Sequence, residues 1–292
     1  MKAFKYLSPT TVEEAIDFHG QHSETAKYIG GGTDVIVKVK EGWNEPDYLI
    51  SLKKIQEMSE LHKNNATGEL SIGAMVTHAT LEKSLMIQNE YPIIYDAVSN
   101  IGSLQVRNVG TIGGNLINAV PSADGAIPLI ALDGIALLHG PDGERSVEVK
   151  DLFIAPYKTI LKPREILKKI TIPPQAPHTG SAYIKFGRRA AMELPLIGIG
   201  VLLTLEEDDS CVKARICLGV AAPVPMRAFD AENFLVGKKI DEAVLIEAGK
   251  IAADESKVRD SVRGKAWHRK EMIRVHVRRM GLKCLNMIKD NN

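Results

Sequence analysis

The sequence predicts an α+β fold of three units, and three features of the chain lead to this prediction. In residues 1–176, apolar stretches of strand length alternate with stretches of helical periodicity, as in small α/β units. The segment QAPHTGS at 175–181 interrupts this pattern, and its Pro and Gly are typical of a boundary. Three strand patterns and then helices follow it. We therefore expect a first domain at 1–176, with subdomains at 1–55 and 56–176, and a second domain at 177–292.

The first unit begins with a helix and contains a glycine loop. Thr10 and Glu13 have the spacing of a capping box, so we expect a helix to begin there. Residues 26–29 and 48–52 have the pattern of short strands, and 33–40 carries apolar residues at helical spacing. The order strand, glycine loop and helix N-terminus is an arrangement that binds phosphate.

The second unit contains strands, helices and a long glycine-rich stretch. Pro173 and Pro174 end its last strand, because proline cannot continue a central strand. A hairpin is predicted around the turn GPDGE. The expected strands are 70–74, 135–139, 146–149 and 166–172, and the expected helices are 77–84, 92–100 and 126–132.

The third unit is predicted to be a three-stranded antiparallel sheet followed by helices. The polar turn EEDDS joins two of its strands. The expected strands are 182–187, 196–205 and 212–220, and the expected helices are 228–236, 240–254 and 268–285.

Composition and net charge argue against a nucleic-acid-binding function. The chain has 292 residues, 45% of them hydrophobic, and 37 basic against 36 acidic side chains. This is an ordinary globular composition, and the net charge of +1 argues against a nucleic-acid binder. The basic segment 269–283 is broken by apolar residues at helical spacing, so we interpret it as a solvated or subunit-facing helix.

The sequence also gives expectations about location and metal content. No run approaches the roughly 18 apolar residues of a membrane span, and the N-terminus lacks the apolar core of a signal peptide, so we expect a cytoplasmic protein. The chain has 3 cysteines, at 211, 217 and 284, without CxxC spacing. We expect free thiols and no iron–sulfur cluster.

Two glycine clusters predict the binding site. Gly102, Gly110, Gly113 and Gly114 lie in the stretch 101–133, and a second cluster occupies 30–32. Glycines permit close approach of the backbone, and N–H groups in such loops can converge on an anion. Two loops suggest one ligand whose diphosphate is gripped from two sides, although plain turn glycines are an alternative. Neither cluster is a GxGxxG, so a Rossmann fold is not indicated.

Six motifs in order carry a resemblance to a known family. The chain resembles the FAD-binding, medium subunit of the molybdenum hydroxylases, the family of xanthine dehydrogenase and carbon monoxide dehydrogenase. The resemblance covers residues 4–280 and implies a PCMH-type FAD-binding fold with a C-terminal domain of the CO dehydrogenase flavoprotein type. The motifs are GGGTD at 30–34, IGAMVTH at 72–78, TIGGN at 111–115, PSAD at 121–124, KFGRR at 185–189 and GVAAPVPMRA at 219–228.

The resemblance implies a set of cofactor-binding residues and no catalytic residue or metal ligand. Two loops would wrap the FAD diphosphate, an aspartate would bind the ribityl or adenosine side, and a lysine would reach the flavin. The implied set is Tyr28, Ile29, Gly30, Gly31, Gly32, Thr33, Asp34, Val35, Ile101, Thr111, Ile112, Gly113, Gly114, Asn115, Asp124, Ile166, Leu167 and Lys185.

Structural roles are alternatives for several of these residues. Asp34 could cap the following helix rather than bind a ribose hydroxyl, and Asp124 could cap the helix at 126–132. A core strand would explain the apolar pair at 166–167, and Lys185 could be an exposed strand lysine. His78, which follows Thr77, makes covalent flavin attachment conceivable, but the family holds FAD non-covalently, and we expect the same here.

The resemblance implies an electron-transfer function. The FAD would take electrons from two-iron two-sulfur clusters on a small subunit and pass them to NAD or another acceptor, while a large subunit carries the molybdopterin. Glu193 and Pro195 replace the family's usual aspartate and alanine, which leaves the acceptor open. We expect a heterotrimer. The alternatives are a free-standing FAD oxidoreductase with its own substrate pocket, or a structural subunit that has lost FAD.

Overall fold

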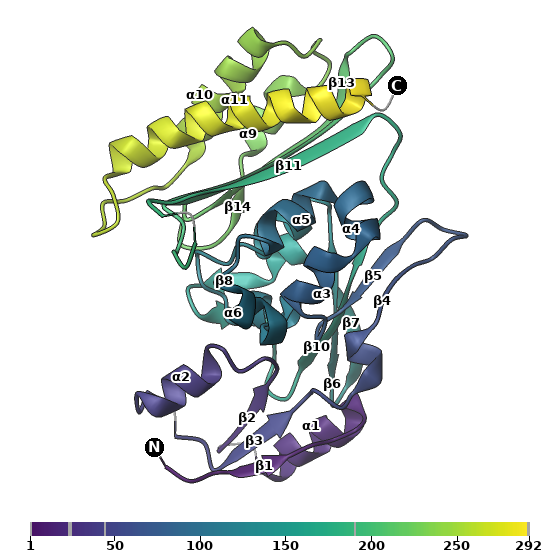
Figure 1. Cartoon of the computed structure of the whole chain (residues 1–292), viewed down its shortest axis with the longest axis vertical. Helices are drawn as coiled ribbons and strands as arrows, with labels where there is room; N and C mark the ends of the chain where they lie inside the picture. Colours follow the sequence, from purple (N-terminus) through teal and green to yellow (C-terminus); the bar gives the residue numbers. More distant parts are fainter. Residues whose placement is uncertain (1, 23–24, 44, 190, 291–292) are drawn as a thin grey trace.

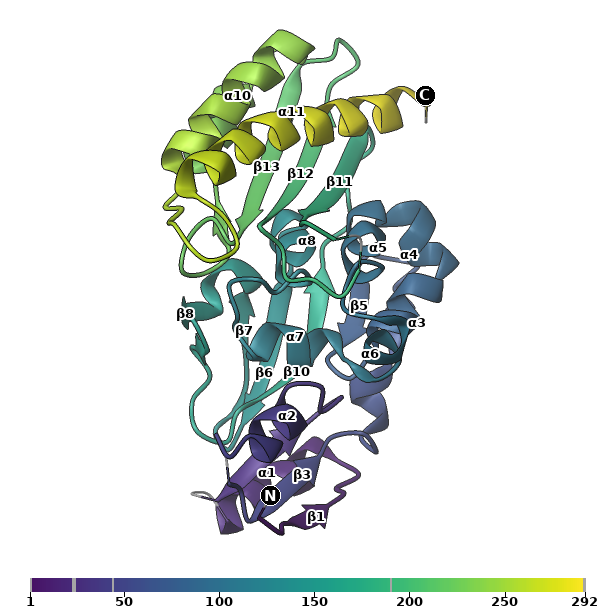
Figure 2. The ribbon, with the colours of Figure 1, turned by 60° about the vertical axis from the view of Figure 1, so that its left-hand side comes forward.

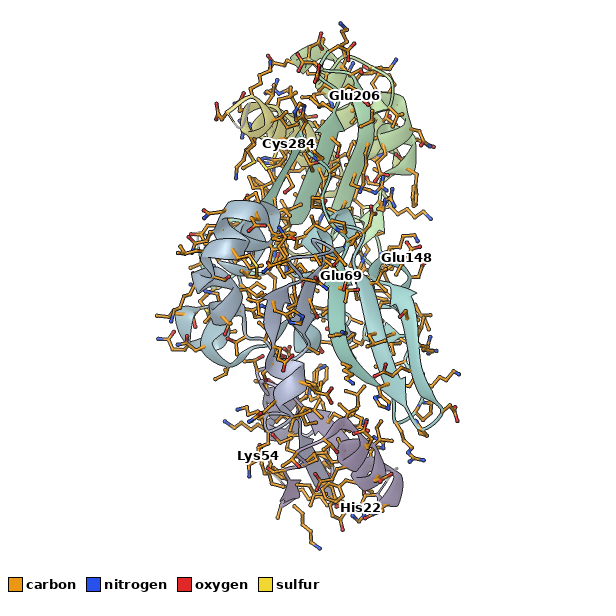
Figure 3. All side chains as sticks on the ribbon, turned by 90° about the vertical axis from the view of Figure 1, so that its right-hand side faces the viewer. His22, Lys54, Glu69, Glu148, Glu206 and Cys284 are labelled. Atoms are coloured by element: carbon orange, nitrogen blue, oxygen red, sulfur yellow. The ribbon has the colours of Figure 1, made fainter. Side chains whose placement is uncertain are left out.

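The three units follow one another along an elongated molecule in the computed structural model, which describes residues 2–22, 25–43, 45–189 and 191–290. Figure 1 shows the first unit at one end, the second in the middle and the third at the other end. In Figure 3, His22 marks the end formed by the first unit and Glu206 the end formed by the third. Met1 and residues 291–292, the ends of the predicted domains, lie outside the described residues. No helix among those described is long and apolar enough to cross a membrane.

The first unit is a small parallel sheet with two helices. The strand order is β1-β3-β2, and both pairings are parallel. Its described elements are β1 (Lys5–Leu7), α1 (Val12–Gln21), β2 (Ala26–Ile29), α2 (Val35–Lys40) and β3 (Tyr48–Ser51). The two predicted strands and both helical stretches are confirmed, whereas β1 is an addition to the prediction.

The cap of α1 lies one residue later than the predicted capping box. Thr11 is the N-cap, and its hydroxyl accepts a hydrogen bond of 3.1 Å from the backbone N–H of Glu14. The carboxylate of Glu14 in turn accepts one of 2.7 Å from the N–H of Thr10. The predicted pair of Thr10 and Glu13 was wrong because the doubled threonines and doubled glutamates permit the same spacing in two registers.

The second unit is built on an antiparallel sheet with strand order β4-β5-β10-β6-β7. Its strands are β4 (Leu61–Lys63), β5 (Leu70–Gly73), β6 (Ile135–Gly140), β7 (Gly143–Glu148) and β10 (Ile166–Ile172), with a separate small pair of β8 (Phe153–Ala155) and β9 (Lys158–Thr159). The predicted hairpin and the predicted last strand are confirmed.

The glycine-rich stretch of the second unit contains more helix than the sequence suggested. The described helices are α3 (His78–Lys83), α4 (Leu85–Glu90), α5 (Pro92–Val98), α6 (Leu104–Val109), α7 (Ile112–Ile117) and α8 (Ala126–Ala131), with 3-10 turns at Gln56–Ser59 and Val149–Asp151. The expectation of a loop over α6 and α7 was wrong. Ser103 and Thr111 each cap a helix with their hydroxyl, and these caps offset the low helix propensity of glycine.

The third unit has four strands rather than the predicted three. The order is β11-β12-β13-β14, and every pairing is antiparallel. The added strand is a two-residue edge strand, too short to show any alternation. The elements are β11 (Thr179–Phe186), β12 (Ile197–Leu205), β13 (Cys211–Gly219), β14 (Met226–Arg227), α9 (Phe229–Leu235), α10 (Glu242–Glu255) and α11 (Ala266–Asp290).

The described residues form two apolar cores. One core joins the first and second units and includes Val12, Ile50, Ile72 and Ile170. The other lies in the third unit between its sheet and α9, α10 and α11. Every residue of β12 is buried, because helices of the second unit cover one face of this sheet and α11 covers the other.

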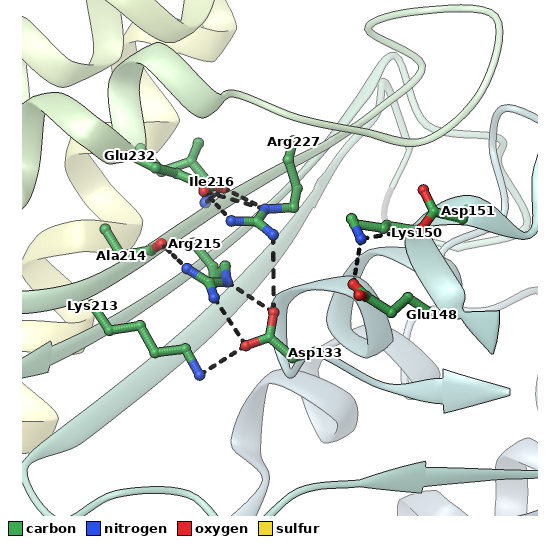
Figure 4. A network of polar contacts seen from close by, with 10 residues as sticks. All are labelled: Asp133, Glu148, Lys150, Asp151, Lys213, Ala214, Arg215, Ile216, Arg227 and Glu232. Carbon is green, nitrogen blue, oxygen red and sulfur yellow. Dashed lines mark hydrogen bonds and ion pairs between the residues drawn. The ribbon is translucent and has the colours of Figure 1, made fainter. Parts of the chain in front are cut away.

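An ionic cluster joins the second and third units (Figure 4). The carboxylate of Asp133 lies 2.8 Å from both Lys213 Nζ and Arg215 Nε on β13. Arg227 on β14 lies 4.0 Å from the same carboxylate and also pairs with Glu232. The cluster therefore attaches the turn before β6 to the C-terminal sheet.

Candidate functional site

A cleft between the first and second units brings most of the predicted site residues together. Its volume is about 430 Å³. Figure 2 shows α2 of the first unit directly below α7 of the second, on the two sides of this junction. The predicted residues that line the cleft are Tyr28, Gly30, Gly31, Gly32, Thr33, Asp34, Val35, Ile101, Thr111, Gly113, Gly114, Asn115, Ile166 and Leu167.

The first glycine loop follows β2 and offers unused backbone donors. Within the described chain, the N–H groups of Gly31, Gly32, Thr33 and Asp34 donate to no backbone carbonyl oxygen. Gly32 has a φ of +79°, which L side chains rarely adopt. A Cβ at Gly31 would lie 2.0 Å from the carbonyl oxygen of Val109. This loop can therefore pass against the second loop only because it lacks side chains.

The second glycine loop is the beginning of α7, and the N–H groups of both of its glycines are already engaged. The N–H of Gly113 donates to the carbonyl oxygen of Ala74 at 2.9 Å, and that of Gly114 donates to the hydroxyl of Thr111 at 3.1 Å. The expectation that these N–H groups are free to meet an anion was therefore wrong. A Cβ at Gly114 would meet only the Thr111 hydroxyl, at 3.0 Å, so its other sides are open.

Neither aspartate serves as the helix cap that the sequence left open. Asp34 occupies the N-cap position of α2, but its side chain makes no capping hydrogen bond. Its carboxylate is exposed beside the hydroxyl of Thr33, at 3.5 Å. The N-cap of α8 is Gly125, not Asp124, and it has no side-chain cap. Helix capping therefore explains neither carboxylate.

Four predicted residues lie off the cleft. The side chains of Ile29 and Ile112 are 8% and 1% exposed and belong to the protein interior. Asp124 and Lys185 meet instead at the boundary with the third unit, where their side-chain atoms approach to 2.8 Å. The alternative of an exposed strand lysine is therefore wrong, because the Lys185 side chain is only 11% exposed.

Asp124 is the buried centre of a small polar group. Besides Lys185, it accepts a hydrogen bond of 2.6 Å from the hydroxyl of Tyr183. Burial raises the pKa of the Asp124 carboxyl, and the Lys185 ammonium and the Tyr183 hydroxyl oppose that rise. Lys185 also donates to the carbonyl oxygen of Asn100 at 3.0 Å, one residue before the cleft-lining Ile101.

Several residues of the cleft were not among the predicted cofactor contacts, although the sequence had drawn attention to His78. His78 lines it and is 2% exposed, and its Nδ1 has no hydrogen-bond partner among the described residues. Burial and the nearby Arg107 lower the pKa of this imidazole to about 4. Lys38, Asn118 and Tyr157 also line the cleft. Helical spacing gave a signal for Lys38, which lies one turn after Asp34, but Tyr157 is brought in only by tertiary structure.

Family models match nearly the whole chain. Residues 2–175 match the FAD binding domain in molybdopterin dehydrogenase, and residues 181–284 match the CO dehydrogenase flavoprotein C-terminal domain. The chain belongs to the flavoprotein subunits of the molybdenum hydroxylases.

Relatives and solved structures agree with this assignment. The chain is 29% identical to the alpha subunit of the 6-hydroxypseudooxynicotine dehydrogenase complex of Paenarthrobacter nicotinovorans, over 97% of this chain and 95% of the relative. It is 30% identical to the nicotinate dehydrogenase FAD-subunit of Eubacterium barkeri, over 81% of both chains. A carbon monoxide dehydrogenase from Hydrogenophaga pseudoflava superposes with a TM-score of 0.91, at 29% identity and 98% coverage of both chains.

The cofactor of this molybdenum hydroxylase subunit is FAD, and the residues of the cleft fit it. The first glycine loop lines the cleft, and its N–H groups at Gly31, Gly32, Thr33 and Asp34 donate to no backbone carbonyl oxygen within the described chain. The imidazole of His78 also lines the cleft, and its buried Nδ1 has no hydrogen-bond partner among the described residues. Within the described residues, no group of three or more His, Cys, Asp or Glu is arranged to hold a metal ion.

Proposed function

We propose that this FAD subunit takes electrons from two-iron two-sulfur clusters on a small subunit and passes them to NAD or another acceptor. A large subunit with molybdopterin would complete a cytoplasmic heterotrimer. The observation that supports the proposal is that both glycine loops, from two different units, line one cleft. When bound, FAD supplies the redox chemistry, and the protein supplies its position and electrostatic environment.

The chain's residues would act on the two halves of the cofactor in different ways. The N–H groups of the first glycine loop would donate to the diphosphate. Ile166 and Leu167 also line the cleft, but each is only 3% exposed, so they act mainly as core residues of β10. Asp124 would bind a hydroxyl of the ribityl or adenosine side, and Lys185 would stabilise negative charge on the reduced flavin. Both would then rearrange from the ion pair that they form with each other.

The segment after β11 is a candidate for contact with the electron acceptor. Glu193, which replaces the usual aspartate of the family, contacts two arginines of the same segment. Its carboxylate lies 3.3 Å from Arg188 Nε and also accepts a hydrogen bond from the N–H of Arg189. The longer acid therefore still joins the two ends of this segment.

The cofactor content of the purified chain tests the first part of the proposal. We expect about one FAD per chain, an absorption spectrum of an oxidised flavin, and no iron. Acid precipitation should release all the flavin into the supernatant, because the binding is non-covalent. Flavin that remains with the pellet would contradict non-covalent binding, and stoichiometric iron would contradict the assignment of the clusters to another subunit.

Assembly and acceptor are tested on the complex. Co-expression with candidate large and small subunits should give one species in gel filtration that contains FAD, iron and molybdenum. Substrate-reduced complex is then mixed with NAD⁺, with oxygen or with an artificial acceptor, and flavin absorbance is followed. Full activity of the chain alone, without either partner, would favour a free-standing oxidoreductase instead.

A further inference from the structure

Lys38 is a half-buried cation in the cleft without an acidic partner. It lies on α2, and its Nζ donates to the side-chain oxygen of Asn118 at 2.9 Å. The same ammonium lies 5.0 Å from the centroid of the Tyr157 ring. Both partners are neutral, and no carboxylate in the described part of the chain forms an ion pair with Lys38. Its charge is therefore solvated by an amide and a ring rather than neutralised.

The other charged groups of the cleft do not compensate Lys38. Glu165 is engaged by Arg145, at 2.8 Å. The exposed carboxylate of Asp34 lies beside Thr33, and the exposed Lys27 adds a second positive charge. The wall between the glycine loops therefore carries an excess of positive charge that suits an anionic ligand.

The two glycines of the second loop do not provide the missing donors. The N–H groups of Gly113 and Gly114 already donate within the protein. A diphosphate in this cleft carries two negative charges, and neither glycine of the second loop has a free N–H to offer it. A side-chain cation on the first unit is the group that could supply the remaining compensation.

We propose that Lys38 binds the diphosphate of the cofactor. On binding, its ammonium leaves the Asn118 oxygen for a phosphate oxygen, while the Tyr157 ring continues to cover it. An ammonium on a flexible stem suits a phosphate as a point charge. A salt bridge to phosphate is also stronger than the neutral contacts that it replaces. The proposal rests on FAD being the cofactor, which is tested separately by whether the wild-type chain binds FAD.

The test compares Lys38→Met with Lys40→Met. Lys40 lies on the same helix but is exposed and lines no part of the cleft. FAD is titrated into each apo-protein at several NaCl concentrations, and flavin fluorescence gives the dissociation constant. We expect Lys38→Met to weaken FAD binding by roughly tenfold to a hundredfold, the effect of one charge-assisted hydrogen bond. The dependence of affinity on salt should also become shallower, because one ionic contact is lost.

Two further variants separate ligand binding from a structural role. Lys38→Arg keeps the charge and should keep the affinity within a few fold of wild type. Asn118→Ala removes the resting partner of Lys38 and should weaken FAD binding far less than Lys38→Met does. Equal affinities of Lys38→Met and Lys40→Met would overturn the proposal. So would an equal loss in Asn118→Ala and Lys38→Met with the salt dependence of wild type, because that result describes a clasp between the two units.

Discussion

The ammonium of Lys185 lies 2.8 Å from the carboxylate of Asp124, and this ion pair joins β11 of the C-terminal unit to the FAD-binding units. Both side chains are almost fully buried, at 11% and 6% exposure. The same two residues were predicted to contact the cofactor. Their pairing therefore forms a contact between the two domains.

Replacing Lys185 should destabilise the protein in a pH-dependent way. Lys185→Met leaves the buried Asp124 carboxylate without a cation, which costs about 3–5 kcal/mol when a buried pair is broken. Burial raises the folded-state pKa of Asp124 even with Lys185 present, and loss of the ammonium should raise it further. A group with a raised folded-state pKa stabilises the protein below its unfolded pKa, and this stabilisation is lost as pH rises through the folded pKa. Unfolding by urea should therefore show the largest loss at pH 7 and a partial recovery near pH 4.

A double variant serves as the control for this pair. Lys185→Met with Asp124→Asn removes both charges, so it should be more stable at pH 7 than Lys185→Met alone. If the single and double variants have the same stability at pH 7, the carboxylate is not the origin of the loss.

The imidazole of His78 should make the protein sensitive to acid. Its folded-state pKa is about 4 against 6.5 in the unfolded chain, so stability is fully present above pH 6.5 and is lost as pH falls toward 4. The loss at pH 4 should be about 3 kcal/mol. His78→Leu should remove this part of the acid dependence. The exposed His62 is the control, and His62→Leu should keep the wild-type profile when unfolding free energies are compared between pH 7 and pH 4.

The two glycine loops should respond differently to substitution. Gly31→Ala places a Cβ 2.0 Å from the Val109 carbonyl oxygen, so backbone must move, and we expect a lower melting temperature and an altered cleft. Gly114→Ala meets only the Thr111 hydroxyl and should fold almost normally. Gly114→Val should fold as well, but its methyl groups would occupy the cleft and weaken FAD binding by orders of magnitude, roughly the loss of several charge-assisted hydrogen bonds.

Circular dichroism and flavin titration check these glycine variants together. Asp124→Ala should bind FAD more tightly than Gly114→Val, because it removes one hydroxyl partner at about 1–3 kcal/mol. A folded Gly114→Val that binds FAD like wild type would show that the diphosphate does not lie against this loop.

Much of the architecture was predictable because the signals are local. The strand at β10 is bounded by Pro173 and Pro174, and the hairpin of β6 and β7 surrounds a turn sequence. The glycine clusters are visible in the sequence, but plain turn glycines would give the same pattern, and only the fold brings both clusters to one cleft. The N-cap of α1 could not be predicted to the residue, because Thr10 and Thr11 precede Glu13 and Glu14 at equal spacings. The packing of the helix selects Thr11.

The missed parts depend on tertiary contacts that no local pattern encodes. The helix α7 contains Gly113 and Gly114, and it forms because Thr111 caps it and Ala74 accepts one of its N–H groups. The pairing of Asp124 with Lys185 spans 61 residues of sequence and brings two separately predicted cofactor contacts together. Tyr157 enters the cleft from a turn after β8, with nothing in its neighbourhood to indicate a site.

The ionic cluster around Asp133 should contribute to the joining of the units. Burial alone would raise the pKa of the Asp133 carboxyl, but hydrogen bonds from Arg215 and Lys213 hold it below its usual value. Its stabilisation is therefore present above the unfolded pKa and is lost as pH falls through the folded pKa. Asp133 has a φ of +53°, which asparagine tolerates well. Asp133→Asn consequently removes the charge without adding backbone strain.

We expect Asp133→Asn to lower the free energy of unfolding by about 1–2 kcal/mol at pH 7, a value reduced for the partial exposure of the cluster. The difference from wild type should shrink as pH falls below 4, where the wild-type carboxyl also loses its charge. Asp142→Asn, in the exposed turn before β7, should change stability little and serves as the control. A difference between wild type and Asp133→Asn that stays constant from pH 7 to pH 3 would mean that shape rather than charge at Asp133 holds the two units together.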